Sequence, residues 1–408
     1  MGRRTRWATD VALTWVVAFV AALSAGRIVQ WLQWVRDRPA GASMWWAALP
    51  AAGAVVAIVI VSVARAAPSA TAVHAEAMND GSLDLRGAPA RLFALFASVG
   101  AGGPLGADTP LMSVGGALGG VVARRTRRPE RWLMIATSAA VLAMVIGAPL
   151  AGALATSEIA WRRRPARRDV VPLALGGVAA WVALRLTGER GGIVGVDLGL
   201  DVDDMVIGVI TIAGVAGLVG RLFATAVRRV EVVRPLYGGA LRRRLVAAAL
   251  SLGAAVPLAW WLTGAPILLG SGEQLRTWSA QQGQLPVLAA TLVFVTLLLV
   301  QIGCGVVGGA VVPLLAIGAL LGTLVGRAWL PGVPFVACVG IGACCVLAAG
   351  HGTPRTAIAI ALSSFGVTPA AAVAAVGVVI ATLVAGPGSV VARQLPASEH
   401  RGGPHVRS

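Results

Sequence analysis

Long apolar runs constrain the fold of this 408-residue chain more than any other feature. These runs approach or exceed the roughly 20 residues that a membrane-spanning helix needs. They are continuous, whereas the strands of a membrane barrel alternate apolar and polar residues. The composition agrees, because 57% hydrophobic residues and a mean hydropathy of +0.81 exceed what a water-soluble core of this size requires. The predicted fold class is an all-α polytopic membrane protein, and the clearest runs lie at 11–26, 45–64, 132–155 and 285–326.

The positive charge of the chain comes from arginine alone, since the sequence contains no lysine and has a formal net charge of +17. The arginines cluster in short segments between apolar runs, which indicates loops retained in the cytoplasm rather than a nucleic-acid surface. The acidic stretch "DLGLDVDDM" at 197–205 is then predicted to lie outside. We expect a multi-pass protein of the cell inner (plasma) membrane, embedded in the lipid bilayer, with cytoplasmic N- and C-termini and no nucleic-acid partner. The first apolar run continues past the length of a signal-peptide core and is predicted to be a retained helix.

One short pattern occurs twice in the chain. The segments "GADTPLMSVGGALG" (106–119) and "GAVVPLLAIGALLG" (309–322) agree at seven of fourteen positions with an offset of 203 residues, which is half the chain. Such an offset is typical of internally duplicated membrane proteins. We therefore predict a first membrane half at 1–195, which carries Ser69 and the GADTP motif, and a second half at 196–392, which carries the GAVVP motif. A short polar cytoplasmic tail is predicted at 393–408.

Each copy of the pattern predicts a helix that begins at membrane depth. Gly106 and Gly309 precede Pro110 and Pro313, and a helical pattern follows each proline, which suits proline in the first turn of a helix. A break inside an apolar run is tolerated where the freed backbone groups line a cavity or meet a ligand. The unpaired N–H groups and the positive end of the helix dipole favour an anion there. Two such helix starts, one from each half, would bind an anion near the midplane loosely enough to release it.

Ionisable residues in the apolar segments are candidates for function. Asp108 costs about 2.5 to 3.5 kcal/mol at the membrane centre, which favours a role in an ion pathway, although a helix cap is the simpler alternative. Glu158 is either functional or paired with Arg162 at helical spacing. His351 lies beside a helix start, where a structural role is favoured over proton transfer. The four cysteines have no spaced histidine partners, and no set of catalytic groups is present, so neither a metal site, a cofactor nor an enzyme is predicted.

Several of these segments resemble motifs of the CLC chloride channels and chloride/proton antiporters. Gly106–Pro110 is similar to the family's G-[KR]-E-G-P helix start, and Gly309–Pro313 to its G-x-F-x-P helix start. The segment 68–80 faintly resembles the G-S-G-I-P region, of which only the serine is retained. "PLAGALATSE" (149–158) and "TPRTAIAIAL" (353–362) resemble two further family segments. The order and spacing of all five agree with the family across nearly the whole chain.

The resemblance implies a homodimer in which each subunit has its own anion pathway, built from two inverted-topology halves of tilted and broken helices. It also implies roles for individual residues. Asp108 would be a gate that competes with the anion. Apart from the resemblance, Glu158 and His351 are the candidates for a proton pathway. The anion-binding residues carried over from the motifs are Ser69, Ala107, Thr109, Ala310, Val311 and Thr368.

Four departures from the family pattern limit what the resemblance implies. Asp108 is one methylene shorter than the family's glutamate gate, which puts in question whether it reaches the central anion site in the same way. The family's inner proton-accepting glutamate corresponds to Ile159, its inner tyrosine falls on Thr368 without gaps, and the phenylalanine of the second motif is Val311. Proton coupling is the property that these changes affect most.

From these observations we predict transport of chloride or a similar small monovalent anion, gated by Asp108 and either passive or weakly coupled to protons. Two alternatives remain open at this point. The first is a fluoride/proton or chloride/proton antiporter of the same fold. The second is a non-transporting membrane scaffold derived from that fold, which the divergence of the motifs suggests.

Overall fold

The computed structural model of the chain describes residues 3–37, 44–67, 87–160, 167–188, 202–237 and 241–391. Its described residues form helices and one isolated antiparallel bridge, which confirms the predicted all-α fold class. The α-helices of the first half of the chain are α1 (Arg3–Asp37), α2 (Leu49–Val63), α4 (Gly87–Ser98), α5 (Asp108–Thr126), α6 (Glu130–Ile146), α7 (Pro149–Ala160) and α8 (Arg167–Thr187). Those of the second half are α9 (Val202–Tyr237), α10 (Leu241–Thr263), α11 (Glu273–Ser279), α12 (Gln284–Cys304), α13 (Val311–Trp329), α14 (Phe335–Val346), α15 (Pro354–Phe365) and α16 (Pro369–Ala385). Two short turns of other helix types complete the set, η2 (Met44–Ala48) and η3 (Leu347–His351).

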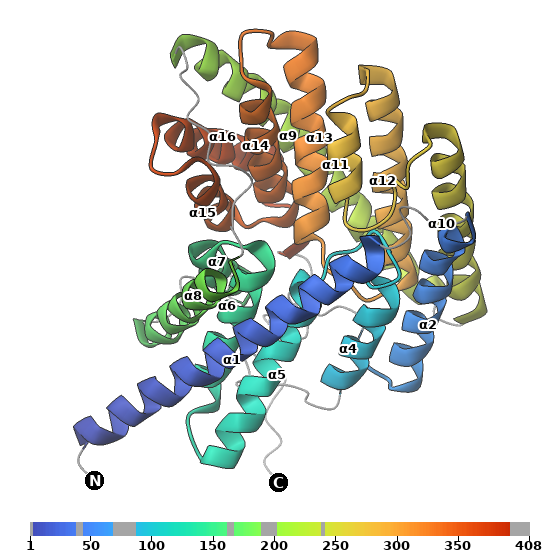
Figure 1. Cartoon of the computed structure of the whole chain (residues 1–408). Coiled ribbons are helices and arrows are strands. Elements are labelled where there is room, and N and C mark those ends of the chain that lie inside the picture. The colour runs from blue at the N-terminus through green and yellow to red at the C-terminus, as the bar shows by residue number, and fades with distance from the viewer. Residues whose placement is uncertain are drawn as a thin grey trace, which may run out of the picture.

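Seven helices in the described ranges are long and apolar enough to cross a membrane, judged by length and composition. Their apolar spans are Thr5–Val35, Trp46–Val63, Arg167–Thr187, Val206–Val230, Leu241–Thr263, Gln284–Cys304 and Val311–Trp329. Many of the helices are tilted against one another and differ in length (Figure 1). This arrangement agrees with the polytopic membrane protein that the apolar runs predicted.

The order of helices in the first half of the chain recurs in the second. Helices α1 and α9 have 35 and 36 residues, α5 and α13 have 19 each, and α7 and α15 have 12 each. Contacts recur as well, since α1 packs on α6 and α8 while α9 packs on α14 and α16. Helices α5 and α13 run in opposite directions from the middle of the molecule (Figure 1). The fold therefore has two inverted halves; the predicted boundaries at 195/196 and 392/393 fall outside the described residues and stay predictions.

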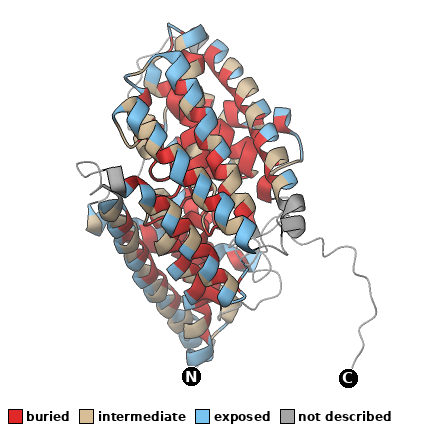
Figure 2. Ribbon diagram, turned by 90° about the vertical axis from the view of Figure 1, so that its right-hand side faces the viewer, coloured by how far each residue is buried: buried red, intermediate tan, exposed pale blue. Residues whose placement is uncertain are grey.

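Glycines allow neighbouring helices to touch at the same place in each half. In the first half, a Cβ added to Gly119 of α5 would lie 2.6 Å from the carbonyl oxygen of Leu133 in α6. In the second, a Cβ on Gly322 of α13 would lie 2.0 Å from the carbonyl oxygen of Cys338 in α14. Small residues at helix interfaces are a common device of membrane proteins, because they let backbones approach closely. The buried residues accordingly occupy the interior between the helices, and the exposed ones cover the outer faces (Figure 2).

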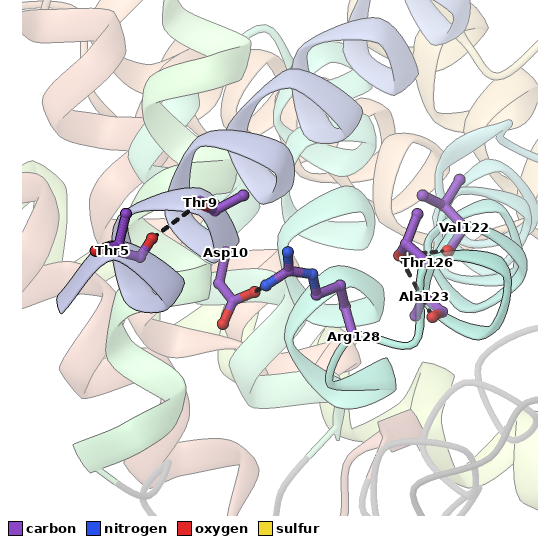
Figure 3. Close-up of polar contacts among 7 residues, drawn as sticks. All are labelled: Thr5, Thr9, Asp10, Val122, Ala123, Thr126 and Arg128. Atoms are coloured by element: carbon purple, nitrogen blue, oxygen red, sulfur yellow. Dashed lines mark hydrogen bonds and ion pairs between the residues drawn. The ribbon is translucent and has the colours of Figure 1, made fainter. Parts of the chain in front are cut away.

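Two ion pairs fasten the basic end of α5 and the start of α6 to other helices. Asp10 of α1 pairs with Arg128 in the turn that follows α5 (Figure 3). Arg131 of α6 donates to both carboxylate oxygens of Asp169 in α8 at 3.0 Å, and Asp169 is only 1% exposed. Part of the arginine cluster at 124–131 is therefore held in internal contacts, beyond the topological role that the sequence indicated.

Candidate functional site

The two repeated motifs meet in the middle of the molecule. The N–H of Gly106 donates to the carbonyl oxygen of Gly309 at 2.8 Å, and the N–H of Gly309 donates back to Gly106 at 2.7 Å. This pair of bonds is the antiparallel bridge between the two halves. Helix α5 begins two residues after Gly106 and α13 begins two residues after Gly309, so the two helix starts lie side by side. Pro110 and Pro313 each lie at the third position of their helix, within the first turn, where a missing N–H removes no intrahelical bond.

The carboxylate of Asp108 connects these two helix starts. Asp108 is the first residue of α5 and is 0% exposed. Its Oδ1 accepts a hydrogen bond from the N–H of Thr109 at 2.7 Å, and its Oδ2 accepts one from the N–H of Val312 in α13 at 3.0 Å. The cap residue of α5 is Ala107, without a side-chain cap bond. Asp108 therefore contacts the backbone of its own helix start and also the N-terminus of the helix from the other half.

Glycine at position 309 is a steric requirement of this arrangement. A Cβ added there would lie 1.2 Å from Asp108 Oδ1 and 2.7 Å from Thr109 Oγ1. At Gly106 the corresponding Cβ would lie 3.2 Å from Asp108 Oδ2, which is tight but less severe. The motif glycine of the second half therefore leaves the space that the carboxylate of the first half fills.

Two hydroxyl groups hold the loops that lead into the helix starts. Ser98 at the end of α4 donates to the carbonyl oxygen of Val307 at 2.7 Å. Ser271, in the connection between α10 and α11, donates to the carbonyl oxygen of Leu105 at 3.0 Å. Neither serine was predicted from the sequence, because nothing in its local pattern indicates a partner 166 or more residues away.

The electrostatics of the site come from backbone dipoles. Asp108 forms no salt bridge with any described residue, and its oxygens accept bonds from N–H groups at helix starts. Helix N-termini favour negative charge through these N–H groups and the helix dipole. The described residues also contain no group of metal-ligating side chains. The site therefore offers backbone donors from two helix starts to an acceptor group, and the Asp108 carboxyl group occupies these donors in this conformation.

The backbone donor of α13 that bonds to Asp108 lies next to the residues that the resemblance implied for the anion, whose roles stay predictions. Ala310 is the cap residue of α13 and Val311 its first residue, with Val311 only 1% exposed. The N–H that bonds to the Asp108 carboxylate belongs to Val312, the next residue along. Ser69, the serine retained from the G-S-G-I-P region, lies outside the described residues.

Glu158 also binds the N-terminus of a helix from the other half of the chain. Its Oε1 accepts from the N–H of Arg355 at 2.8 Å, and its Oε2 accepts from the N–H of Thr356 at 2.9 Å and from the Thr356 hydroxyl at 2.6 Å. These donors form the first turn of α15, whereas Glu158 lies in α7. The alternative partner Arg162 lies outside the described residues. A carboxylate from the first half thus occupies a helix N-terminus of the second half at two places.

His351 and Thr368 have local partners. The Nδ1 of His351 lies 3.3 Å from the Thr353 hydroxyl, and the imidazole is buried with 1% exposure just before α15. Thr368 is the N-cap of α16, where its hydroxyl accepts from the N–H of Ala371 and donates to the carbonyl oxygen of Phe365. No described hydrogen bond links either side chain to Asp108. Their roles in proton transfer and anion binding stay predictions.

Comparison with known proteins identifies the family of the chain. The family model described as "Voltage gated chloride channel" matches residues 51–386. The chain is 29% identical over 295 residues to a chloride/fluoride channel protein of Pseudomonas syringae pv. tomato, and 28% identical over 291 residues to an H(+)/Cl(-) exchange transporter ClcA of Cronobacter sakazakii. Both alignments cover 67% of this chain and 61% of the relative, so the chain spans about three-fifths of their length.

Solved structures share the fold. A CLC-type fluoride/proton antiporter matches with a TM-score of 0.82 and 17% identity, over 97% of this chain and 100% of that one. A slow cyanobacterial Cl-/H+ antiporter matches with a TM-score of 0.74 and 21% identity, over 93% of this chain and 96% of that one. The family model covers more than half of the chain, and the structural matches extend over almost all of it. The chain therefore belongs to the voltage gated chloride channel family.

Proposed function

We propose that the protein transports chloride or a similar small monovalent anion across a membrane, through a pathway whose central site is the start of α13. The observation that carries this proposal is the buried Asp108 carboxylate, which accepts the Val312 N–H without a cation partner among the described residues. A site that offers backbone donors at helix N-termini to a buried carboxyl group suits a small anion. The relatives named for chloride, fluoride or proton/chloride exchange support this class of substrate.

Asp108 acts in this proposal as a gate that competes with the transported ion. When the side chain leaves α13, the Val312 N–H becomes free to donate to chloride. When the side chain returns, the carboxylate displaces the anion and closes the pathway. Backbone donors suit this exchange, because they hold an anion without the full charge of an arginine and so allow release. The site would be lined by Ala107, Thr109, Ala310 and Val311. The pathway would continue from this site past Ser69 and Thr368.

Weak or absent proton coupling is the second part of the proposal. Ile159, at the position of the family's inner glutamate, is 0% exposed and packs in an apolar cluster with Met112, Leu142, Ala155 and Val391. An isoleucine cannot carry a proton. The neighbouring Glu158 is already bound to the first turn of α15. We further propose a homodimer in the cell inner membrane, with both termini cytoplasmic, no cofactor and no enzymatic activity.

Coupled exchange of chloride or fluoride with protons is the alternative function. It is favoured by the names of the related exchange transporter and of the structurally similar fluoride/proton antiporter. Glu158, which lies next to Ile159, would then have to leave α15 and accept the proton.

Flux from proteoliposomes distinguishes these functions. Purified protein is reconstituted with potassium chloride, potassium fluoride or potassium gluconate inside, and efflux is started with valinomycin while the external pH is recorded. We expect chloride efflux that exceeds gluconate efflux, with little proton movement. Stoichiometric proton uptake during efflux would support the antiporter, and fluoride efflux far above chloride would support its fluoride form. Absence of flux for every anion in folded protein would contradict the proposal and favour the scaffold.

A further inference from the structure

We propose that a pocket between the basic ends of α9 and α10 and the C-terminal end of α12 binds one anionic glycerophospholipid. The pocket has a volume of about 460 Å³ and is lined by residues of these three helices. Helices α10 and α12 lie next to each other at one edge of the molecule (Figure 1). The site is separate from the Asp108 site, and the proposal does not depend on the transported ion.

The depth of the pocket matches that of a phospholipid phosphate. Arg228 and Arg229 follow the apolar residues of α9, Arg242 to Arg244 precede those of α10, and the apolar helix α12 ends at Cys304. The lining residues lie at or close to these three ends. The pocket therefore lies where the hydrocarbon of a bilayer gives way to its headgroups, and an acyl chain could extend from it along the helices.

Arginines from two helices supply the charge. Arg229 of α9 and Arg243 and Arg244 of α10 line the pocket. The Nε of Arg244 donates to the carbonyl oxygen of Cys304 at 2.7 Å, which fixes this guanidinium at the end of α12. No acidic side chain is among the described residues that line the pocket. A guanidinium presents several N–H donors in a planar fork, which suits the oxygens of a phosphate.

The remaining lining of the pocket is apolar and suits an acyl chain. Val230, Ala247 and Val300 contribute to this lining. A Cβ on Gly303 would lie 2.4 Å from Val230 Cγ1, so α9 and α12 touch at this side of the pocket. Only 17% of the most apolar 18-residue window of α10 is buried in the protein, which leaves this helix largely open to lipid. A soluble phosphate would leave the apolar lining without a partner, whereas a phospholipid fills both parts.

Native mass spectrometry of the detergent-purified full chain tests this proposal. The protein is titrated with phosphatidylglycerol, with phosphatidylcholine of the same acyl chains, and with inorganic phosphate. The pocket variant is Arg229→Gln/Arg243→Gln, and the matched control is Arg228→Gln/Arg242→Gln. The control removes two exposed charges from the adjacent positions, which do not line the pocket. The two variants therefore have the same net charge and differ in where the charge is lost.

We expect one phosphatidylglycerol per chain to bind in preference to phosphatidylcholine. Each basic residue near a lipid phosphate contributes about 1 kcal/mol, so the pocket variant should bind phosphatidylglycerol about 30-fold more weakly. The control should change by less than about 3-fold, because exposed charges outside the pocket are screened. Ala247→Trp, which fills the cavity and keeps all charges, should also weaken binding.

Three results would overturn the proposal. The first is equal affinity for the two lipids in the native protein. The second is an equal loss of phosphatidylglycerol in the pocket variant and the control. The third is displacement of phosphatidylglycerol by inorganic phosphate at equal concentration, which would indicate a site for soluble phosphate. If Ala247→Trp fails to fold, the two arginine variants still decide between these outcomes.

Discussion

Removal of the Asp108 side chain should open the anion pathway. The carboxylate closes the start of α13 through one bond between the helices, from the Val312 N–H to Oδ2 at 3.0 Å. Its other backbone bond, from Thr109, is local to α5 and does not hold the side chain on α13. Asp108→Ala removes the competing carboxylate and leaves the backbone donor free for chloride.

The size of the effect follows from that single bond. A hydrogen bond to a charged group contributes about 1.5 to 3 kcal/mol, so the closed position is favoured about 10- to 150-fold through it. If departure of the side chain limits transport, chloride flux in Asp108→Ala should exceed that of the native protein by about this factor. Asp108→Asn keeps an oxygen in place but only a neutral bond of about 0.5 to 1.5 kcal/mol, so its flux should be intermediate.

Chloride efflux from proteoliposomes with equal protein content measures this change. Ser113→Ala is a matched control, because Ser113 lies on the same helix and its buried hydroxyl has no hydrogen-bond partner among the described residues. The control should transport at the native rate. Flux in Asp108→Ala at or below the native rate, in protein that is folded by size-exclusion chromatography, would refute the gating argument.

Three further predictions follow from the contacts of the two carboxylates. Native chloride flux should rise as the external pH falls, because protonation removes the charge of Asp108 and weakens its bond to α13. The variant Asp108→Ala should show no such rise. A parallel pH response in both proteins would contradict this prediction. Gly309→Ala places a methyl group 1.2 Å from Oδ1, so folded protein should show the raised flux of Asp108→Ala, and native flux would contradict the steric argument. Glu158→Ala removes the acceptor for the first turn of α15 and should lower the free energy of unfolding by about 1 to 3 kcal/mol, measured by thermal unfolding. Glu158→Gln should cause a smaller loss. An unchanged midpoint of thermal unfolding would show that the contact of Glu158 with α15 contributes nothing to stability.

The paired helix starts were predictable from the sequence because their cause is local. Glycine and proline inside an apolar run can be accommodated only at a helix boundary, and two matching runs at half the chain length indicate a repeat. The pattern predicted that the two starts converge, and the structure shows Gly106 and Gly309 bonded to each other. The contact between the Asp108 carboxylate and α13 could not be predicted from the sequence. The bridge brings α13 so close that the shorter side chain still accepts the Val312 N–H.

Contacts between distant segments explain what the sequence did not reveal. Helical spacing indicated Arg162 as a structural partner of Glu158, and Arg162 lies outside the described residues. The donors that the structure shows for Glu158, Arg355 and Thr356, lie 197 and 198 residues further along the chain. An ungapped comparison with the family pattern placed Thr368 at the position of the inner tyrosine of the pathway. In the structure its hydroxyl bonds to Ala371 and Phe365, as a helix cap does. Local spacing predicts neighbours on one helix, whereas the partners of these side chains are decided by how the helices pack.

The central claim is that the start of α13 is an anion site that the Asp108 carboxylate occupies. Anomalous diffraction from bromide-soaked crystals of Asp108→Ala tests it directly, with crystals of the native protein as the control. The account predicts a bromide peak within hydrogen-bond distance of the Val312 nitrogen in the variant, and a weaker peak or none at that place in the native protein. A variant structure with an intact α13 start and no bromide there would contradict the claim.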